Sequence, residues 1–320
     1  MLNWSKWNVA RRLATVQNAL GLLPLIVERL EGLHDIRQEI GSIREQLQHV
    51  QLALGRMEAR QLAASPATSL REQEFKVTSQ FGEDGIIQYL LRHVPIDSKV
   101  FVEFGVEDYT EANTLFLLEQ NKWAGLVIDG SEDNVRRIQE GRAHVFYNLT
   151  AVQAFVTRDN INALLTDNGF TGEIGLLSID IDGNDYWVWE AVTAVHPVLV
   201  IVEYNHRFGS EASVTIPYDP EFVRTQAHPS HTYFGASLRA LCGLAHRKGY
   251  AFVGTGSDGV NAFFVRRDKR PEQVPELSVE EGYHQGHFSE WFGQDGRPIH
   301  LSWEEQHALV MGLPLVQVGE

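Results

Sequence analysis

The stretch KVFVEFGVEDYTEANTLFLLEQNKWAGLVIDGS, residues 99–131, contains two apolar runs, and an acidic residue and a glycine lie at the end of each. The runs at 99–104 and 124–128 predict buried strands, and residues 111–121 between them predict a helix. Consecutive strands joined through a helix are typical of a parallel sheet, because parallel strands need a crossover connection. This stretch therefore indicates an α/β fold.

The same alternation continues on both sides of this stretch. Further strands are expected at 143–148, 174–179 and 198–202, and further helices at 84–94, 132–140, 160–168, 186–195 and 237–248. Residues 250–254 and 261–265 flank the turn Ser257-Asp258-Gly259 and predict a final antiparallel pair. The sequence thus predicts an α/β, Rossmann-like fold with a doubly wound, mostly parallel sheet and a C-terminal antiparallel hairpin.

Polar residues at the ends of the first two strands indicate a nucleoside-binding site. In doubly wound sheets, ligands bind beyond the carboxyl ends of the strands. Glu103 and Gly105 lie at the first end, and Asp129 lies at the second, twenty-four positions after Gly105. An acid at the second end is placed to bind ribose hydroxyls, whereas the single glycine departs from the dinucleotide pattern G-x-G-x-x-G. Alternatively, the glycine serves only a tight turn, and Ser131 caps the next helix.

Acidic residues also follow the next two buried strands. Asp180 and Asp182 come after residues 174–179, and Glu203 and Asn205 come after residues 198–202. Neighbouring strand ends converge, and carboxylates that repel one another are relieved by a cation or by shared protons. Carboxylate oxygens suit Mg²⁺, so these four residues form a candidate metal site. The alternative is a set of helix caps and solvated loop acids.

The order and spacing of four motifs resemble the FkbM-like methyltransferases. The motifs are SQFGEDG at 79–85, EFG at 103–105, IDGS at 128–131 and IDIDGNDY at 179–186, and the resemblance covers residues 73–267. It implies a class I methyltransferase fold and methyl transfer from S-adenosylmethionine, usually to a hydroxyl of a sugar, a polysaccharide or a natural product.

The resemblance also implies roles for individual residues. Glu103 and Gly105 would line the methionine side of the cofactor, Asp129 would bind the ribose, and Gln80 and Glu83 would close over the cofactor. The further positions assigned to cofactor binding are Asn113, Ser131 and Asp180. The acidic cluster is also similar to that of metal-dependent O-methyltransferases, which hold Mg²⁺ with an Asp after the fourth strand and an acid–Asn pair after the fifth. Here Tyr204 separates that pair, which is a departure from the pattern.

Transfer to a hydroxyl requires a group that accepts its proton. Asp180 and Asp182 are candidates, and so is a histidine, which takes protons near neutral pH. His206 directly follows the acidic pair, and His228 and His231 lie in a long loop, residues 207–232. We retain His206 and His231 as the candidate catalytic histidines, although loop histidines are commonly only solvated.

The first 62 residues predict a coiled coil. Ile26, Leu33, Ile40, Leu47 and Leu54 repeat every seven residues, and so do Ile36, Ile43, Val50 and Met57. This seam is typical of a self-associating helix, and Leu and Ile at the first positions with Ile at the second favour a trimer or tetramer. The alternative is an amphipathic helix folded back on its own domain. The expected organisation is a coiled coil at 1–62, a linker at 63–73, a methyltransferase domain at 74–267 and an aromatic and histidine-containing tail at 268–320.

Composition narrows the class of protein. The chain has 320 residues, 43% hydrophobic and 22% charged, with a formal net charge of -15. This charge argues against nucleic acid as a partner. The single cysteine, Cys242, and the lack of a membrane-spanning run lead us to expect a cytoplasmic protein. Two rival hypotheses are a metal-dependent glycosyltransferase, in which Asp180 and Asp182 form an Asp-x-Asp motif, and a non-catalytic coiled-coil scaffold with a degenerate methyltransferase fold.

Overall fold

The computed structural model describes residues 3–64, 69–287, 292–293 and 297–319, with only the backbone for residues 3–28, 30, 31 and 34. The chain forms two compact units, Met1–Leu54 and Gly55–Glu320, which are described separately. No helix among the described residues is both long enough and apolar enough to cross a lipid bilayer.

The N-terminal unit belongs to one long helix, α1 (Asn3–Ala63). The apolar side chains of the predicted seam are exposed in the single chain, with exposed fractions from 47% at Ile40 to 63% at Met57. Ile26, the first member of the seam, lies outside the residues whose side chains are described. The predicted helix is therefore present, and its assembly with other copies stays a prediction.

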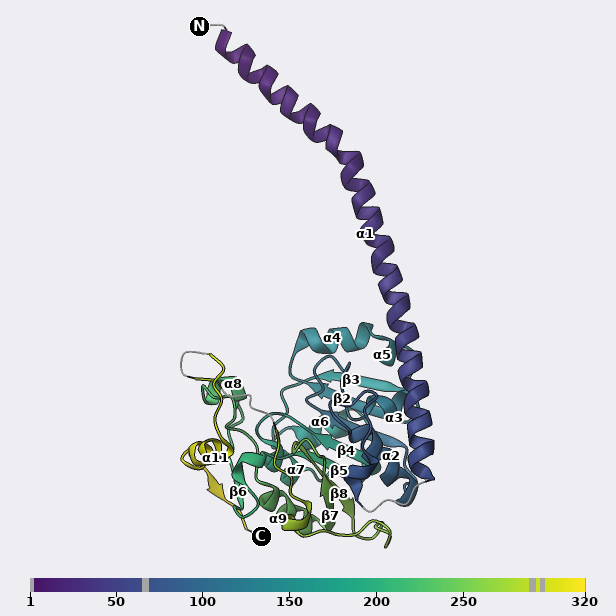
Figure 1. The fold of residues 1–320 in the computed structure, drawn as a ribbon, viewed down its shortest axis with the longest axis vertical. Coiled ribbons are helices and arrows are strands. Elements are labelled where there is room, and N and C mark those ends of the chain that lie inside the picture. Colours follow the sequence, from purple (N-terminus) through teal and green to yellow (C-terminus); the bar gives the residue numbers. More distant parts are fainter. Residues whose placement is uncertain (1–2, 65–68, 288–291, 294–296, 320) are drawn as a thin grey trace. The chain divides into compact units, whose positions relative to one another are not determined.

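The second unit is built on a seven-stranded sheet in the order β3-β2-β1-β4-β5-β8-β7 (Figure 1). The strands are β1 (Val100–Phe104), β2 (Ala124–Asp129), β3 (Leu149–Gln153), β4 (Gly172–Ile179), β5 (Val195–Glu203), β7 (Tyr250–Thr255) and β8 (Asn261–Arg266). The first five are parallel to one another, and β8 pairs antiparallel with both β5 and β7. The predicted Rossmann-like, doubly wound sheet with a C-terminal antiparallel hairpin is confirmed.

Helices cover both faces of this sheet. One face packs on α6 (Ile161–Asp167), α7 (Asp185–Ala191) and α9 (Leu238–Lys248), through residues such as Leu165, Trp189 and Leu241. The other face packs on α2 (Glu83–His93), α3 (Leu115–Glu119) and α4 (Glu132–Glu140), through residues such as Ile86, Leu118 and Val135. Because both faces are buried, the central strands are apolar along nearly their whole length.

The third strand does not lie where the sequence predicted it. Residues 143–148 were expected to be a strand, but α5 (Arg142–Phe146) is a short helix and β3 begins at Leu149. The misleading residues are Val145 and Phe146, whose side chains are 62% and 69% exposed. The true strand alternates buried Leu149 and Ala151 with less buried neighbours, which marks an edge strand of the sheet.

The last turns of α1, residues 55–63, belong to the second unit. Gly55 is buried beneath Val77 and Phe116, and a Cβ at Gly55 would lie 3.1 Å from the Phe116 ring. The Arg56 side chain donates to Gln120 at 3.0 Å, and the Arg92 side chain donates to the carbonyl of Ala59 at 3.0 Å. Residues 55–63 therefore form part of the folded body that carries the sheet.

The segment between β5 and α9, together with the C-terminal tail, forms a layer beside the strand ends. It contains η2 (His206–Phe208), β6 (Val214–Thr215), α8 (Arg224–Ala227), α10 (Val279–Gly282), α11 (Trp303–Met311) and β9 (Val316–Gln317), and η1 (Leu70–Gln73) precedes α2. β9 pairs with β6, and His307 of α11 bonds the carbonyl of Arg207 at 2.7 Å. The tail thus packs on the loop after β5, while Trp291 lies outside the described residues.

Candidate active site at the carboxyl ends of the strands

The strand order reverses between β1 and β4, and the loops after these two strands touch. Gly105 has φ of 71°, and a Cβ there would overlap the carbonyl oxygen of Asp180. Only glycine fits both this backbone conformation and this close approach. The crevice beyond the contact contains two cavities of about 300 and 190 Å³, which share Gly105, Glu107 and Asp182 as lining residues. The candidate site therefore lies where doubly wound folds bind their ligands.

The smaller cavity combines apolar side chains with the carboxylates of Asp129, Glu107 and Asp182. Ile128, Val156, Ile181 and Phe222 line it, together with Asp129 at the end of β2. An apolar slot beside a carboxylate suits a flat base attached to a sugar whose hydroxyls donate hydrogen bonds. This cavity has the chemistry of a nucleoside site.

Asp129 is already part of a hydrogen-bond network. Its carboxylate accepts from the amide of Glu107 at 2.9 Å, from the amide of Ser131 at 2.8 Å and from the Asn134 side chain at 3.1 Å. A carboxylate has about four acceptor positions, so one position is left for a ligand hydroxyl. Ser131 caps α4 by accepting from the amide of Asn134, and it lines neither cavity.

Glu103 and Asn113 line the larger cavity, and hydrogen bonds within its wall hold their side chains. The Glu103 carboxylate accepts from the amides of Asn113 and Thr114, at 2.9 and 3.1 Å, and from the Thr114 hydroxyl at 2.5 Å. The Asn113 side chain donates to Ser178 at 3.1 Å. Burial raises the pKa of Glu103 to about 7. These contacts shape the wall of the cavity, and they begin α3 later than the sequence predicted.

The segment before β1 contributes two predicted residues in different ways. Gln80 lines the larger cavity, whereas Glu83 does not. The buried Glu83 carboxylate accepts from the amide of Phe81 at 2.9 Å and from the Asn261 side chain at 2.9 Å. Asn261 also lines the larger cavity, and its buried Oδ1 has no hydrogen-bond partner among the described residues. The only sequence signal for Asn261 was its position at the start of the last predicted strand, and it was not predicted as a site residue.

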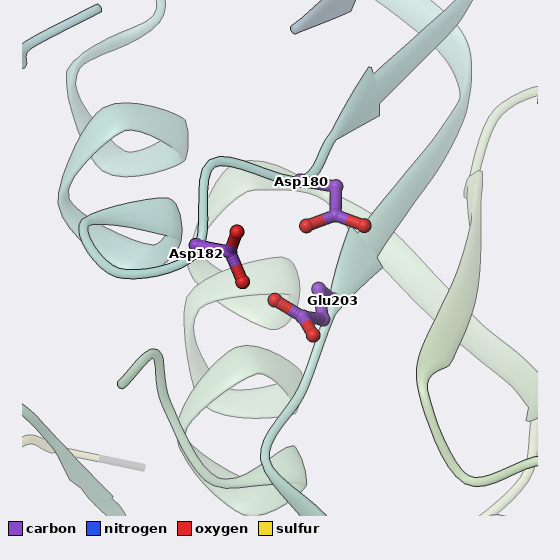
Figure 2. Close-up of side chains that lie close together, drawn as sticks. All are labelled: Asp180, Asp182 and Glu203. Carbon is purple, nitrogen blue, oxygen red and sulfur yellow. The ribbon is translucent and has the colours of Figure 1, made fainter. Parts of the chain in front are cut away.

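Three carboxylates meet at the end of β4 and β5 and form an acidic cluster, Asp180, Asp182 and Glu203. Each offers an oxygen within 4.8 Å of the others, and Figure 2 shows the three side chains pointing toward one another. Glu203 is 7% exposed, and its Oε2 has no hydrogen-bond partner among the described residues. Burial, together with repulsion from neighbouring carboxylates, raises the pKa of Asp180 and of Glu203 well above the ordinary range. The cluster is therefore expected to hold a proton or a cation at neutral pH.

Asn205, the fourth predicted metal ligand, is directed elsewhere. Its amide nitrogen donates to the carbonyls of Thr232 and Phe234, at 2.8 and 3.1 Å, and its oxygen accepts from the amide of Arg207 at 3.2 Å. Asn205 does not line either of the two cavities. Its amide holds the loop after β5 in place.

The histidines also separate by position. His206 is 3% exposed and lines the larger cavity, and neither of its ring nitrogens has a hydrogen-bond partner among the described residues. Burial, followed by the nearby charge of Arg207, lowers the pKa of His206 to about 3, so its ring is neutral at physiological pH. His228 and His231 line neither cavity, and the His231 ring packs on Phe292 at 4.9 Å.

Arg224 is a second residue at this site that the sequence did not reveal. It lies on α8, lines the larger cavity and forms an ion pair with Asp182. Its Nε donates to the carbonyl of His231 at 2.6 Å, and its guanidinium lies 3.9 Å from the centre of the Phe234 ring. No local motif marks Arg224, because only the folding of the long loop after β5 brings it to the strand ends.

Similarity to known proteins is distant. No family model and no curated protein matches the sequence. One similar solved structure is the N-terminal domain of EvdMO1 in the presence of S-adenosylhomocysteine and D-fucose, with 14% identity, a TM-score of 0.37 and coverage of 56% of this chain and 80% of that one. The O-methyltransferase from Bacillus cereus in complex with S-adenosylhomocysteine has 15% identity, a TM-score of 0.34 and coverage of 52% and 72%. An S-adenosylmethionine-dependent methyltransferase from Clostridium acetobutylicum has 8% identity, a TM-score of 0.36 and coverage of 57% and 89%. Similarity at this level supports no conclusion about function.

Proposed function

We propose that the protein is an S-adenosylmethionine-dependent O-methyltransferase that acts on a hydroxyl of a sugar, a polysaccharide or a natural product. The observation that carries the proposal is one crevice in which a nucleoside-like slot ending at Asp129 adjoins the acidic cluster. A cofactor spanning the two cavities would place its nucleoside beside Asp129 and its methionine part beside Glu103 and Gly105.

The residues present fit this cofactor. Asp129 retains one acceptor position for a ribose hydroxyl, and the smaller cavity offers apolar side chains such as Ile128 and Phe222 against which a purine ring can pack. The contact of Gly105 with Asp180 brings the loop after β1 directly beside the acidic cluster. S-adenosylmethionine supplies an electrophilic methyl group, which an oxygen nucleophile takes as the carbon–sulfur bond breaks.

The acidic cluster is suited to accept the proton of the acceptor hydroxyl. Glu203 Oε2 is buried at the cavity without a partner among the described residues. Burial, followed by repulsion from Asp180, raises the pKa of Glu203, which makes it a stronger proton acceptor than an ordinary carboxylate. Neutral His206, whose pKa is too low for this task, would orient the hydroxyl by a hydrogen bond. An acceptor that presents several hydroxyls would pair with His206, Glu203 and Asn261, whose polar atoms are buried at the same cavity.

We also propose that Asp180, Asp182 and Glu203 can hold a divalent cation such as Mg²⁺. Their oxygens lie within 4.8 Å of one another, and carboxylates with retained waters are the usual Mg²⁺ ligands. A bound ion would lower the pKa of a coordinated hydroxyl. Asn205 is omitted from this set because its amide is bonded to the loop backbone.

Calorimetric titration with S-adenosylmethionine and S-adenosylhomocysteine, with and without Mg²⁺, tests the proposal. We expect binding that Asp129→Ala weakens at least about tenfold, since a hydrogen bond to a charged group contributes about 1.5–3 kcal/mol. Asp133→Ala is the matched control, because Asp133 is exposed on α4 and pairs only with Arg136 in the contacts described. Absence of binding to either compound would overturn the proposal. Binding of a nucleotide sugar in their place would favour the glycosyltransferase reading of Asp180 and Asp182.

A further inference from the structure

The acidic cluster already has a cation of its own. Arg224 forms an ion pair with Asp182, and its guanidinium also interacts electrostatically with Asp180 and Glu203. Arginine stays protonated at any pH at which proteins fold. One permanent positive charge therefore lies beside three carboxylates whose oxygens are within 4.8 Å of one another.

The Arg224 guanidinium is held in place by more than this attraction. Its Nε donates to the carbonyl of His231 at 2.6 Å, and its plane lies 3.9 Å from the centre of the Phe234 ring. His231 itself has φ of 58°, a conformation that non-glycine residues seldom adopt and that directs its carbonyl to Arg224. An acid, a carbonyl and an aromatic ring each contact a different part of the planar guanidinium. Together these three contacts fix its position and orientation.

The cluster also has features that point to a bound ligand. Glu203 Oε2 and both ring nitrogens of His206 are buried at the same cavity without partners among the described residues. An unpaired buried acceptor is costly, and a cation or a ligand donor would satisfy it. Arg224 neutralises one side of the cluster, at Asp182, and leaves Glu203 Oε2 unpaired.

A divalent ion at the three carboxylates would bind the carboxylate of Asp182, which Arg224 already contacts. Two cations a few ångströms apart repel each other strongly in a partly buried site. We propose that Arg224 is the resident cation of this site, and that its guanidinium and a divalent ion bind the acidic cluster in competition. This inference rests on the ion site of the proposed function.

The proposal gives the chain two states of the same site. With Arg224 in place, the carboxylates are partly neutralised without a metal, and Glu203 is available to an acceptor hydroxyl. With an ion bound, the guanidinium leaves Asp182, and α8 loses its link to the loop after β4. In the state without an ion, His231 is a positioning residue for Arg224. It acts through its backbone carbonyl and not through its ring.

Binding of Mn²⁺ to the full chain, followed by the electron paramagnetic resonance signal of free Mn²⁺, tests the competition. We expect Arg224→Met to bind Mn²⁺ at least tenfold more tightly than the wild type. Arg224→Lys, which keeps the charge, should stay within about threefold of the wild type. Asp182→Asn added to Arg224→Met should abolish the gain.

Arg158→Met is the matched control. Arg158 also stacks on an aromatic ring, Tyr218, at 3.9 Å and also pairs with an acid, Asp159, but it does not line the larger cavity. Its Mn²⁺ affinity should equal that of the wild type. Circular dichroism and thermal unfolding of each variant identify any that fails to fold. If Arg224→Met fails to fold, Arg224→Gln, which also removes the charge but keeps hydrogen-bonding groups, takes its place and should show the same gain in Mn²⁺ affinity.

Arg224→Met that binds Mn²⁺ no more tightly than the wild type would overturn the inference, whether or not the wild type binds the ion. The same samples are titrated with S-adenosylhomocysteine. If neither the wild type nor any variant binds S-adenosylhomocysteine, that result counts against the proposed function. Failure of the competition and failure of the proposed function are therefore distinguishable.

Discussion

The Glu103 carboxylate is buried and engaged by Asn113 and Thr114, whereas Glu203, at the end of β5, has an oxygen without a partner among the described residues. Asp129 lies between these extremes, with three donors and one acceptor position left. In the proposed function, the same chemical group would therefore serve as a wall support, a ribose acceptor and a proton acceptor, according to how many donors surround it.

The raised pKa of Glu103 predicts a pH dependence of stability. The folded chain holds this proton up to a pKa of about 7, whereas the unfolded chain releases it near 4.5, so the stability that Glu103 contributes falls as the pH rises through that window. The change amounts to about 3 kcal/mol across the window. Glu103→Gln cannot titrate, and the difference in unfolding free energy between wild type and variant should shrink by this amount from pH 4.5 to pH 7.

Urea unfolding at intervals of pH measures this difference. Glu111→Gln is the control, because Glu111 lines the same cavity but is half exposed and pairs with Lys76. Its curve should run parallel to that of the wild type. A constant difference between wild type and Glu103→Gln across the window would show that Glu103 is ionised throughout.

Site residues at the ends of strands could be predicted from the sequence, because the end of a strand fixes where the next side chain lies. Asp129, Asp180, Asp182 and Glu203 all line the crevice for this reason. Arg224 and Asn261 were missed because they reach the site through a long loop and an antiparallel strand, whose positions depend on tertiary packing. Asn205 follows a strand too, but two carbonyls of the loop after β5 orient its amide away from the cluster.

At the scale of elements, buried periodic runs were predicted well, and short exposed ones were not. The continuous apolar run of β5 and the capped helix α4 left little choice of assignment. The strand expected at 143–148 was wrong because Val145 and Phe146 suggested burial that the fold does not give them. α3 begins later than expected because Glu103 holds the amides of residues 113 and 114.

The end of α1 provides an element-scale prediction. Residues 55–63 contact the sheet-bearing unit through Gly55, Arg56 and the carbonyl of Ala59. A chain that begins at Gln51 keeps these contacts and should unfold in urea with the free energy of the full chain. A chain that begins at Ala64 should have an unfolding free energy lower by about 2 kcal/mol. It loses two hydrogen bonds, and the Phe116 ring that Gly55 covers becomes exposed. Equal stability of the two shortened chains would place the boundary of the folded unit after Ala63.

At the scale of the whole molecule, eight large apolar side chains from Leu33 to Met57 are 47–63% exposed along one helix. A seam of this period is buried when helices of several chains supercoil around one another. We propose that α1 assembles the protein into a trimer or tetramer. The exposure in a single chain is the observation that supports this proposal.

Charge placed in the seam should dissociate the assembly. Light scattering after size exclusion should give three or four times the chain mass of 36.1 kDa for the wild type, and the single-chain mass for Ile40→Glu combined with Leu47→Glu. Ser42→Glu combined with His49→Glu adds the same charge outside the seam and should leave the mass unchanged. A wild-type chain that elutes at the mass of one copy would rule out assembly through α1.

The two cavities of the crevice have a common wall in Gly105, Glu107 and Asp182. A ligand that shifts this wall from one side changes the surface offered to a ligand on the other side. The resulting coupling is reciprocal: whatever factor a nucleoside ligand applies to the dissociation constant of an acceptor, the acceptor applies to that of the nucleoside ligand. In the proposed function, any cooperativity between donor and acceptor can therefore be measured from either side.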